Sequence, residues 1–249
     1  MQSERAHRRS LAATFPAMSD DEVEYGQRPF QAPPGSTEVF LVRHGQSAAY
    51  RDGHPFPLVD GQGDPPLTAH GQWQAVQVGE RLRHLAPAAV YVTTLQRTVQ
   101  TAAPLLDHIG LTAIVEPDLR EIHLGEWEGG IFRKKVAERD PAFLEVERTQ
   151  DWSAIPGAES FAQLQDRVVG AITRIHAVHP GERIVAVSHG GAIGAALSHA
   201  TGAKPLAFGA TDNGSIAHLI VLGDRWILRR YNDTGHLGGE LSAVAEGLT

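Results

Sequence analysis

Short apolar runs alternate with amphipathic helical segments along most of the chain, and this alternation restricts the possible folds more than any other feature. Apolar strands are predicted at 39–42, 88–94 and 112–117, and a fourth in the stretch "RIVAVS". Two last runs, "SIAHLIVLG" and "RWILRRYN", are joined by Gly223-Asp224, a dipeptide that suits a hairpin turn. The order predicts one α/β domain with a mostly parallel sheet and an antiparallel C-terminal portion.

Each helical segment between these strands carries its apolar residues on one face. Thr68 precedes the first segment and is the expected N-cap. We expect the buried faces to consist of Ala75, Val78, Leu82 and Leu85, of Val99, Ala102, Leu106 and Ile109, and of Phe161, Leu164, Val168, Ile172 and Ile175.

The first 36 residues differ from the rest, because they are rich in charge and proline and end in the linker-like "APPGS". We therefore predict an N-terminal arm over 1–36 and a single domain over 37–249. Within that domain, the polar stretch at about 129–157 is expected to be a lid or insertion rather than core.

Composition excludes several classes of protein. The 22 basic and 29 acidic residues give a net charge of −7, which argues against a general nucleic-acid binder. The absence of cysteine excludes disulfides, thiolate metal sites and thiol catalysis. No apolar run approaches the length of a membrane span and no secretory signal is evident, so we expect a cytoplasmic protein without a membrane partner.

Charged side chains stand where the predicted strands end. Because ligands of open α/β sheets bind beyond the carboxyl ends of the strands, these residues are candidates for one site. They are Arg43 and His44, Arg97 in the first turn of the second helix, Glu121 in the loop after the third strand, and His189.

Each candidate also has a simpler interpretation. A histidine at a strand end can merely bond to nearby backbone, Arg97 can lie on a helix surface, and Glu121 can pair with Arg120. Only their joint appearance at one sheet edge favours a functional site.

Phosphoryl transfer through histidine is the chemistry that suits the set. Two guanidinium groups bind phosphate oxygens and offset the charge of the transition state, and helix N-termini add backbone donors. Positive charge nearby keeps an imidazole neutral and nucleophilic. A carboxylic acid such as Glu121 can then protonate the leaving oxygen.

Other chemistries fit less well. The H-E-x-x-H pattern is absent, two arginines would repel a divalent cation, and His176 and His179 are best interpreted as solvated helix-end histidines, so we expect no metal site. The chain has no P-loop. "IVAVSHGGAIGAA" is similar to a dinucleotide-binding turn, but His189 replaces the first glycine of that fingerprint, so we expect no cofactor.

Seven segments in one order resemble the histidine phosphatase (phosphoglycerate mutase-like) superfamily: "LVRHGQS", "PLTAHGQWQA", "VYVTTLQRTVQTA", "LREIHLGEWEG", "PGAESF", "VSHGGAI" and "DNGSI". The resemblance covers about Glu38 to Tyr231 and implies a three-layer α/β/α sandwich, with 37–249 as the catalytic domain. It implies that His44 is the nucleophile and Glu121 the proton donor. It also implies a phosphate pocket of Arg43, Arg97 and His189 without a metal, to which we add Ser47 and Gly190.

The chain departs from the family pattern just after the first motif, where Tyr50 stands in place of a common asparagine. Gln46, Ser47 or Arg51 are candidates to replace that phosphate contact. Together with Tyr50 and with Arg133 in the expected lid, Gln46 and Arg51 are also candidates to bind the rest of a small phosphorylated metabolite.

The resemblance leaves the activity open. "RHGQS" also occurs in cofactor-dependent phosphoglycerate mutases, but Glu121 is followed here by "IHLGEW", which is similar to the phosphatase branch. We therefore expect a phosphatase, with a mutase as the alternative and a catalytically idle interaction module as a third. A homodimer is an assembly that the sequence leaves open.

Overall fold

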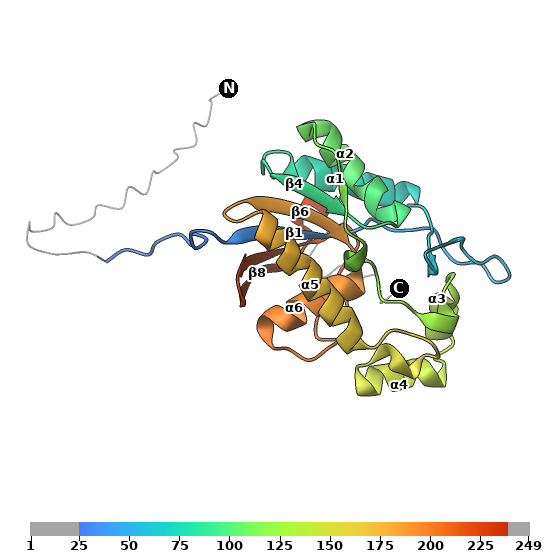
Figure 1. The fold of residues 1–249 in the computed structure, drawn as a ribbon. Helices are drawn as coiled ribbons and strands as arrows, with labels where there is room; N and C mark the ends of the chain where they lie inside the picture. The colour runs from blue at the N-terminus through green and yellow to red at the C-terminus, as the bar shows by residue number, and fades with distance from the viewer. Residues whose placement is uncertain (1–24, 239–249) are drawn as a thin grey trace, which may run out of the picture. The chain divides into compact units, whose positions relative to one another are not determined.

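The computed structural model describes residues 25–238 of the chain (Figure 1). The first 24 residues of the predicted arm and residues 239–249 of the predicted domain lie outside this range. The chain divides into two compact units at Gln31 and Ala32, and the fold described below belongs to the second.

A six-stranded sheet in the order β5-β4-β6-β1-β7-β8 forms the centre of this unit. Four strands are parallel: β1 (Thr37–Arg43), β4 (Ala89–Val92), β5 (Ile114–Val115) and β6 (Arg183–Ser188). β7 (Ile216–Leu222) and β8 (Arg225–Asp233) add the antiparallel edge, and a separate hairpin pairs β2 (Leu58–Val59) with β3 (Gln62–Gly63). The predicted α/β fold class, mostly parallel with an antiparallel C-terminal portion, is confirmed.

Both faces of the sheet are covered, which explains why its central strands are apolar without interruption. Val39 and Leu41 of β1 enter the core beneath α5 (Phe161–Val178) and α6 (Gly190–Thr201), whereas Val42 enters the core beneath α1 (Ala69–Leu82) and α2 (Gln96–Ile109). The two helix pairs lie on opposite faces of the sheet (Figure 1). Successive strand side chains therefore enter different cores, as the three-layer sandwich requires.

Local signals place the helices where the sequence predicts them. The Thr68 side chain accepts a hydrogen bond from the Gly71 amide and starts α1, and Ser160 and Gln163 form a capping box at the start of α5. The hairpin is also confirmed, since Leu222 pairs with Arg225 across the two-residue turn. β5 is shorter than the predicted strand at 112–117.

One residue of a predicted helix face is wrong, whereas Ala102, Leu106 and Ile109 of that face pack in the core as expected. Val99 of α2 is 44% exposed, and Leu105 takes its place in the core. The buried face of α2 also includes Thr98 and Thr101, which hydrogen-bond to backbone, so polar residues occupy inward positions that an apolar pattern cannot reveal.

The segment expected to be a lid or insertion contains α3 (Ile131–Ala137) and α4 (Pro141–Thr149). Although it is polar overall, five of its side chains are buried in the larger core: Phe132, Phe143, Val146, Trp152 and Ile155. The segment is therefore packed onto the domain through aromatic residues. None of the helices within residues 25–238 has the length and apolar character needed to cross a membrane.

Candidate active site

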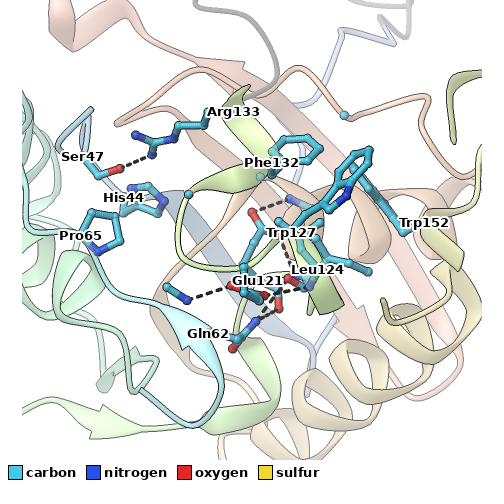
Figure 2. A pocket seen from close by; sticks show the side chains of 18 of the residues that line it. His44, Ser47, Gln62, Pro65, Glu121, Leu124, Trp127, Phe132, Arg133 and Trp152 are labelled. Atoms are coloured by element: carbon cyan, nitrogen blue, oxygen red, sulfur yellow. Dashed lines mark hydrogen bonds between the residues drawn. The ribbon is translucent and has the colours of Figure 1, made fainter. Parts of the chain in front are cut away.

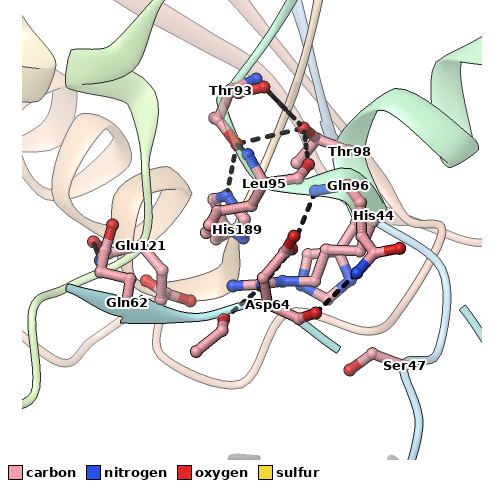
Figure 3. Close-up of polar contacts among 12 residues, drawn as sticks. His44, Ser47, Gln62, Asp64, Thr93, Leu95, Gln96, Thr98, Glu121 and His189 are labelled. Atoms are coloured by element: carbon pink, nitrogen blue, oxygen red, sulfur yellow. Dashed lines mark hydrogen bonds and ion pairs between the residues drawn. The ribbon is translucent and has the colours of Figure 1, made fainter. Parts of the chain in front are cut away.

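The residues that follow the strand ends meet at one edge of the sheet (Figure 3). Because β1 and β6 are parallel neighbours, Arg43 lies in register with Ser188, and the chains leave the sheet together at His44 and His189. The two imidazole rings lie 5.1 Å apart between centroids. One pocket is lined by Arg43, His44, Arg97 and Glu121, together with Ser47 and Gly190.

Gly45 allows the loop that follows β1 to pass close to the start of α1. A β-carbon at this position would lie 2.4 Å from the carbonyl oxygen of Gly71, and one at Gly71 would lie 2.1 Å from that of Gln46. Two glycines are therefore needed where the loop crosses the start of α1. This close approach fixes the backbone on which His44 is mounted.

The hydrogen bonds of His44 define its tautomer. Its Nδ1 lies 2.7 Å from the Gly45 carbonyl oxygen, and the Nε of Arg97 donates to its Nε2 at 3.1 Å. A guanidinium can only donate, so Nε2 holds the lone pair and Nδ1 holds the proton. Burial, and then the charges of Arg97 and Arg43, hold the pKa of His44 well below its usual value. The ring is thus a neutral base whose lone pair lies on Nε2.

His189 is fully buried, and burial followed by the charge of Arg97 also lowers its pKa well below the usual value. Its Nε2 lies 3.1 Å from the hydroxyl of Thr93, the residue that follows β4. Its Nδ1 has no hydrogen-bond partner within residues 25–238. His189 is therefore a second neutral imidazole beside the first.

Arg97 keeps its charge although it is buried. Burial lowers its pKa to about 10, and the carboxylates of Glu121 and Asp64 act in the opposite direction. Its Nη1 donates to the Gly63 carbonyl at 3.0 Å and lies 3.9 Å from Asp64. The guanidinium of Arg43, the second buried arginine, donates to the Thr211 carbonyl. The pocket is thus lined by two buried cationic side chains, Arg43 and Arg97.

Asp64 is a buried site residue that sequence reasoning missed. Its Oδ1 accepts from the Gln96 amide at 2.9 Å, at the N-terminus of α2 that presents Arg97 (Figure 3). It follows β3 of the separate hairpin rather than a strand of the central sheet, so the rule that located the other residues does not apply to it.

Glu121 is positioned by backbone donors. Its Oε1 accepts from the Ile122 amide at 2.9 Å and its Oε2 from the Gly191 amide at 3.2 Å. A β-carbon on Gly191 would lie 2.4 Å from Oε1, so glycine at this turn of α6 leaves room for the carboxylate in its observed position. Arg120 pairs instead with Asp60 at 3.2 Å. Figure 3 shows the Glu121 carboxylate on the opposite side of the site from Ser47.

Arg167 of α5 holds the loop that carries Glu121 and was also missed. It donates to the backbone carbonyls of Asp118, Arg120 and Glu121 at 2.7 to 2.9 Å, and it pairs with Glu159 at 2.7 Å. On an amphipathic helix a charged residue is normally expected to face solvent, and no sequence signal distinguishes Arg167 from such residues.

The candidates for binding the rest of the substrate separate into two groups. Arg133 lines the pocket, donates to the Ser47 hydroxyl at 2.8 Å and lies over the Phe56 ring. Its pKa is lowered by burial and by Arg43. The other candidates do not line this pocket. The side chain of Gln46 accepts a hydrogen bond from Thr68, and the ring of Tyr50 packs edge-on against Phe56. Arg51 is exposed and forms an isolated backbone β-bridge with His54.

Opposite His44 and Ser47 the pocket has an apolar wall, which sequence reasoning did not predict (Figure 2). Its members come from the loop after β5, from the segment expected to be a lid, and from α5 and the loop after α6: Leu124, Trp127, Phe132, Trp152, Phe161 and Leu206. Within residues 25–238, no group of three or more histidine, aspartate or glutamate side chains is arranged to hold a metal ion.

Comparisons with known proteins agree on the family. The model of the "Histidine phosphatase superfamily (branch 1)" matches residues 39–234. A metal-independent phosphoserine phosphatase of Arabidopsis thaliana is 35% identical over 81% of this chain and 83% of its own. A probable phosphoglycerate mutase GpmB of Yersinia enterocolitica is 32% identical over 80% of this chain and 94% of its own.

Among solved structures, a mycobacterial glucosyl-3-phosphoglycerate phosphatase superposes with a TM-score of 0.67 at 28% identity, covering 80% of this chain and all of that one. The relatives thus include both phosphatases and mutase-like proteins. The match over 39–234 spans every residue of the candidate site and the whole sheet except Thr37 and Glu38 at the start of β1, and the chain belongs to the histidine phosphatase superfamily.

Proposed function

We propose that the chain is a phosphatase that hydrolyses a small phosphomonoester through a transient phosphohistidine on His44. The observation that carries the proposal is the tautomer of His44, whose Nε2 lone pair is directed to the cationic side of the pocket by the Gly45 and Arg97 hydrogen bonds. The phosphatase relatives support the same reaction class.

In the first step, Nε2 of His44 attacks phosphorus while the bond from phosphorus to the alcohol oxygen breaks. Arg43 and Arg97 offset the charge on the phosphoryl oxygens. His189, Ser47 and the amide of Gly190 at the start of α6 are proposed as further phosphate contacts.

In the same step Glu121, in its carboxylic acid form, gives its proton to the leaving alcohol oxygen and is left as the carboxylate. In the second step its carboxylate takes a proton from water, the water oxygen bonds to phosphorus, and the bond to Nε2 breaks, which releases inorganic phosphate. His44 returns to the neutral tautomer, so each turnover restores the starting enzyme.

Phosphate release from 4-nitrophenyl phosphate and from phosphoserine, measured in EDTA, tests the proposal. We expect turnover by the wild type, none by His44→Ala, and an acid-labile, base-stable phosphoenzyme on the wild type alone. Activity that requires a metal, or equal activity in His44→Ala, would overturn the mechanism.

Because some relatives are mutase-like, phosphoglycerate mutase activity is the second function to test. Sustained isomerisation of 3-phosphoglycerate in the presence of its bisphosphate primer would favour a mutase, whereas release of inorganic phosphate supports the phosphatase. An idle interaction module would give neither turnover nor labelling.

A further inference from the structure

The pocket is larger than a phosphate group requires, and its two sides differ in chemistry. The side at the strand ends carries Arg43, His44 and Arg97, and the other side is the apolar wall. Figure 2 shows Trp127, Phe132 and Trp152 on the opposite side of the pocket from His44 and Ser47.

The aromatic members of the wall support one another. Phe132 packs against Trp152 with ring centroids 5.6 Å apart and against Trp127 at 6.3 Å, and all three are at most 9% exposed. Side chains held this firmly present a preformed surface to the pocket. Apart from indole N–H groups, the wall's side chains carry no hydrogen-bonding atom.

The polar side chains near the wall are bonded to the protein, and Gln62 Oε1, which has no hydrogen-bond partner within residues 25–238, is buried. Glu128 accepts from the amides of Gly63 and Leu124, each at 2.8 Å, and the Gln62 amide group donates to the Glu121 carbonyl at 2.7 Å. Arg133 lies on the phosphate side, where it bonds to Ser47. A substrate hydroxyl or carboxylate directed at the wall would therefore lose water without gaining a comparable contact.

We infer that the alcohol part of the substrate is apolar, so that the natural substrate is a phosphomonoester of an aliphatic or aromatic alcohol rather than of a polyol, hydroxy acid or amino acid. This inference rests on the proposed phosphatase function and names its substrate class. The phosphoryl group binds at His44 and the apolar group covers the wall, where each methylene buried strengthens binding.

A homologous series of n-butyl, n-hexyl and n-octyl phosphates tests the inference, because the leaving alcohols are chemically alike and differ only in apolar area. We expect kcat/KM to rise about threefold to fourfold per buried methylene until the wall is covered. Glycerol 3-phosphate, similar in size to butyl phosphate and with the more acidic alcohol, should be the poorer substrate.

Two partly buried wall residues allow the wall to be changed with little risk to folding. Leu206→Asn and Leu124→Asn should each flatten the chain-length dependence and lower kcat/KM for octyl phosphate about tenfold. Leu144→Asn is the matched control, since Leu144 is 38% exposed on α4 and does not line the pocket, and it should keep the wild-type dependence.

A kcat/KM that is independent of chain length, or a preference for glycerol 3-phosphate or phosphoserine over butyl phosphate, would overturn the inference and leave the phosphatase intact. If no phosphomonoester is hydrolysed at all, including 4-nitrophenyl phosphate, the proposed function itself fails. Unaltered chain-length dependence in both wall variants would also overturn the inference.

Discussion

A pair of histidines lies at each end of the parallel strands, and the two pairs differ in their surroundings and hydrogen bonds. At the carboxyl end, His44 and His189 are buried beside Arg97, which helps to lower their pKa values. At the amino end, His176 bonds to the Thr37 hydroxyl at 2.7 Å, and His179 bonds to Tyr91 and Glu182 at 2.9 and 2.7 Å.

The difference shows what separates the proposed nucleophile from a structural histidine. Both ring nitrogens of His179 have protein partners, so its bonds tie α5 to β4 and to the start of β6. Both ring nitrogens of His44 are also bonded to the protein, but His44 lines a pocket together with the cations Arg43 and Arg97, which can bind a substrate anion. Position relative to strand direction, rather than residue type, decides the role.

The largest expected effect separates the two ends directly. His44→Asn should lower kcat by about 10⁴-fold or more, because the proposed nucleophile is lost while the site keeps its shape. His179→Asn, at the other end, should change kcat less than twofold. Steady-state phosphate release compares the two, and equal losses would mean that His44 acts through stability alone.

Arg97 should have the next largest effect. Arg97→Gln removes a buried cation that contacts His44, and we expect kcat/KM to fall about 10²–10³-fold. Arg183→Gln is the matched control, because Arg183 pairs with Glu38 at the amino end and its side chain is 53% exposed. A loss of similar size in both variants would contradict the assigned site.

Glu121→Gln tests the proton donor through its dependence on the leaving group. We expect about a 10²-fold loss with an alkyl phosphate, whose alkoxide needs a proton, and a much smaller loss with 4-nitrophenyl phosphate, whose phenolate does not. The ratio of the two losses is the measurement. An equal loss with both substrates would assign Glu121 to positioning only.

Strand direction alone was enough to predict much of the candidate site. Arg43, His44, Arg97, Glu121 and His189 meet as expected, because each follows a strand or opens the helix after it, and parallel strands end at one edge.

The residues that were missed reach the site by other routes. Asp64 follows the separate hairpin rather than the central sheet, Arg167 comes from the inner face of a helix, and Trp152 comes from a segment whose overall polarity concealed its buried aromatic residues. Their contacts are tertiary, so no local pattern could reveal them. His176 and His179, expected to be solvated, are partly buried and hydrogen-bonded for the same reason.

The pH dependence of stability should also distinguish the histidines at the carboxyl end of the strands. Since the fold holds His44 neutral below its usual pKa of 6.5, the unfolded chain binds the extra proton, and stability falls as the pH drops below 6.5. One such histidine contributes a slope of about 1.4 kcal/mol per pH unit. Urea unfolding between pH 7 and pH 5 should show that the free energy of unfolding of His44→Gln depends less on pH than that of the wild type, by this amount.

A core variant provides the control for that measurement. Val39→Ala removes apolar contact at a fully buried position without touching a titrating group, so its loss of stability should be the same at both pH values. A slope that His44→Gln leaves unchanged would mean that the folded protein protonates His44 as readily as the unfolded chain does.

The smallest expected effect belongs to the amino end. The Thr37 hydroxyl is buried, bonds to His176 and donates to the His179 carbonyl at 2.7 Å. Thr37→Val keeps the shape of the side chain but removes both bonds, so the free energy of unfolding should fall by about 1–2 kcal/mol. Because these bonds lie at the opposite end of the strands from the pocket, kcat/KM should stay within twofold of the wild type. A larger loss of activity would mean that the hydrogen bonds at the amino end help to set the geometry of the site, and that the two ends of the sheet are coupled rather than independent.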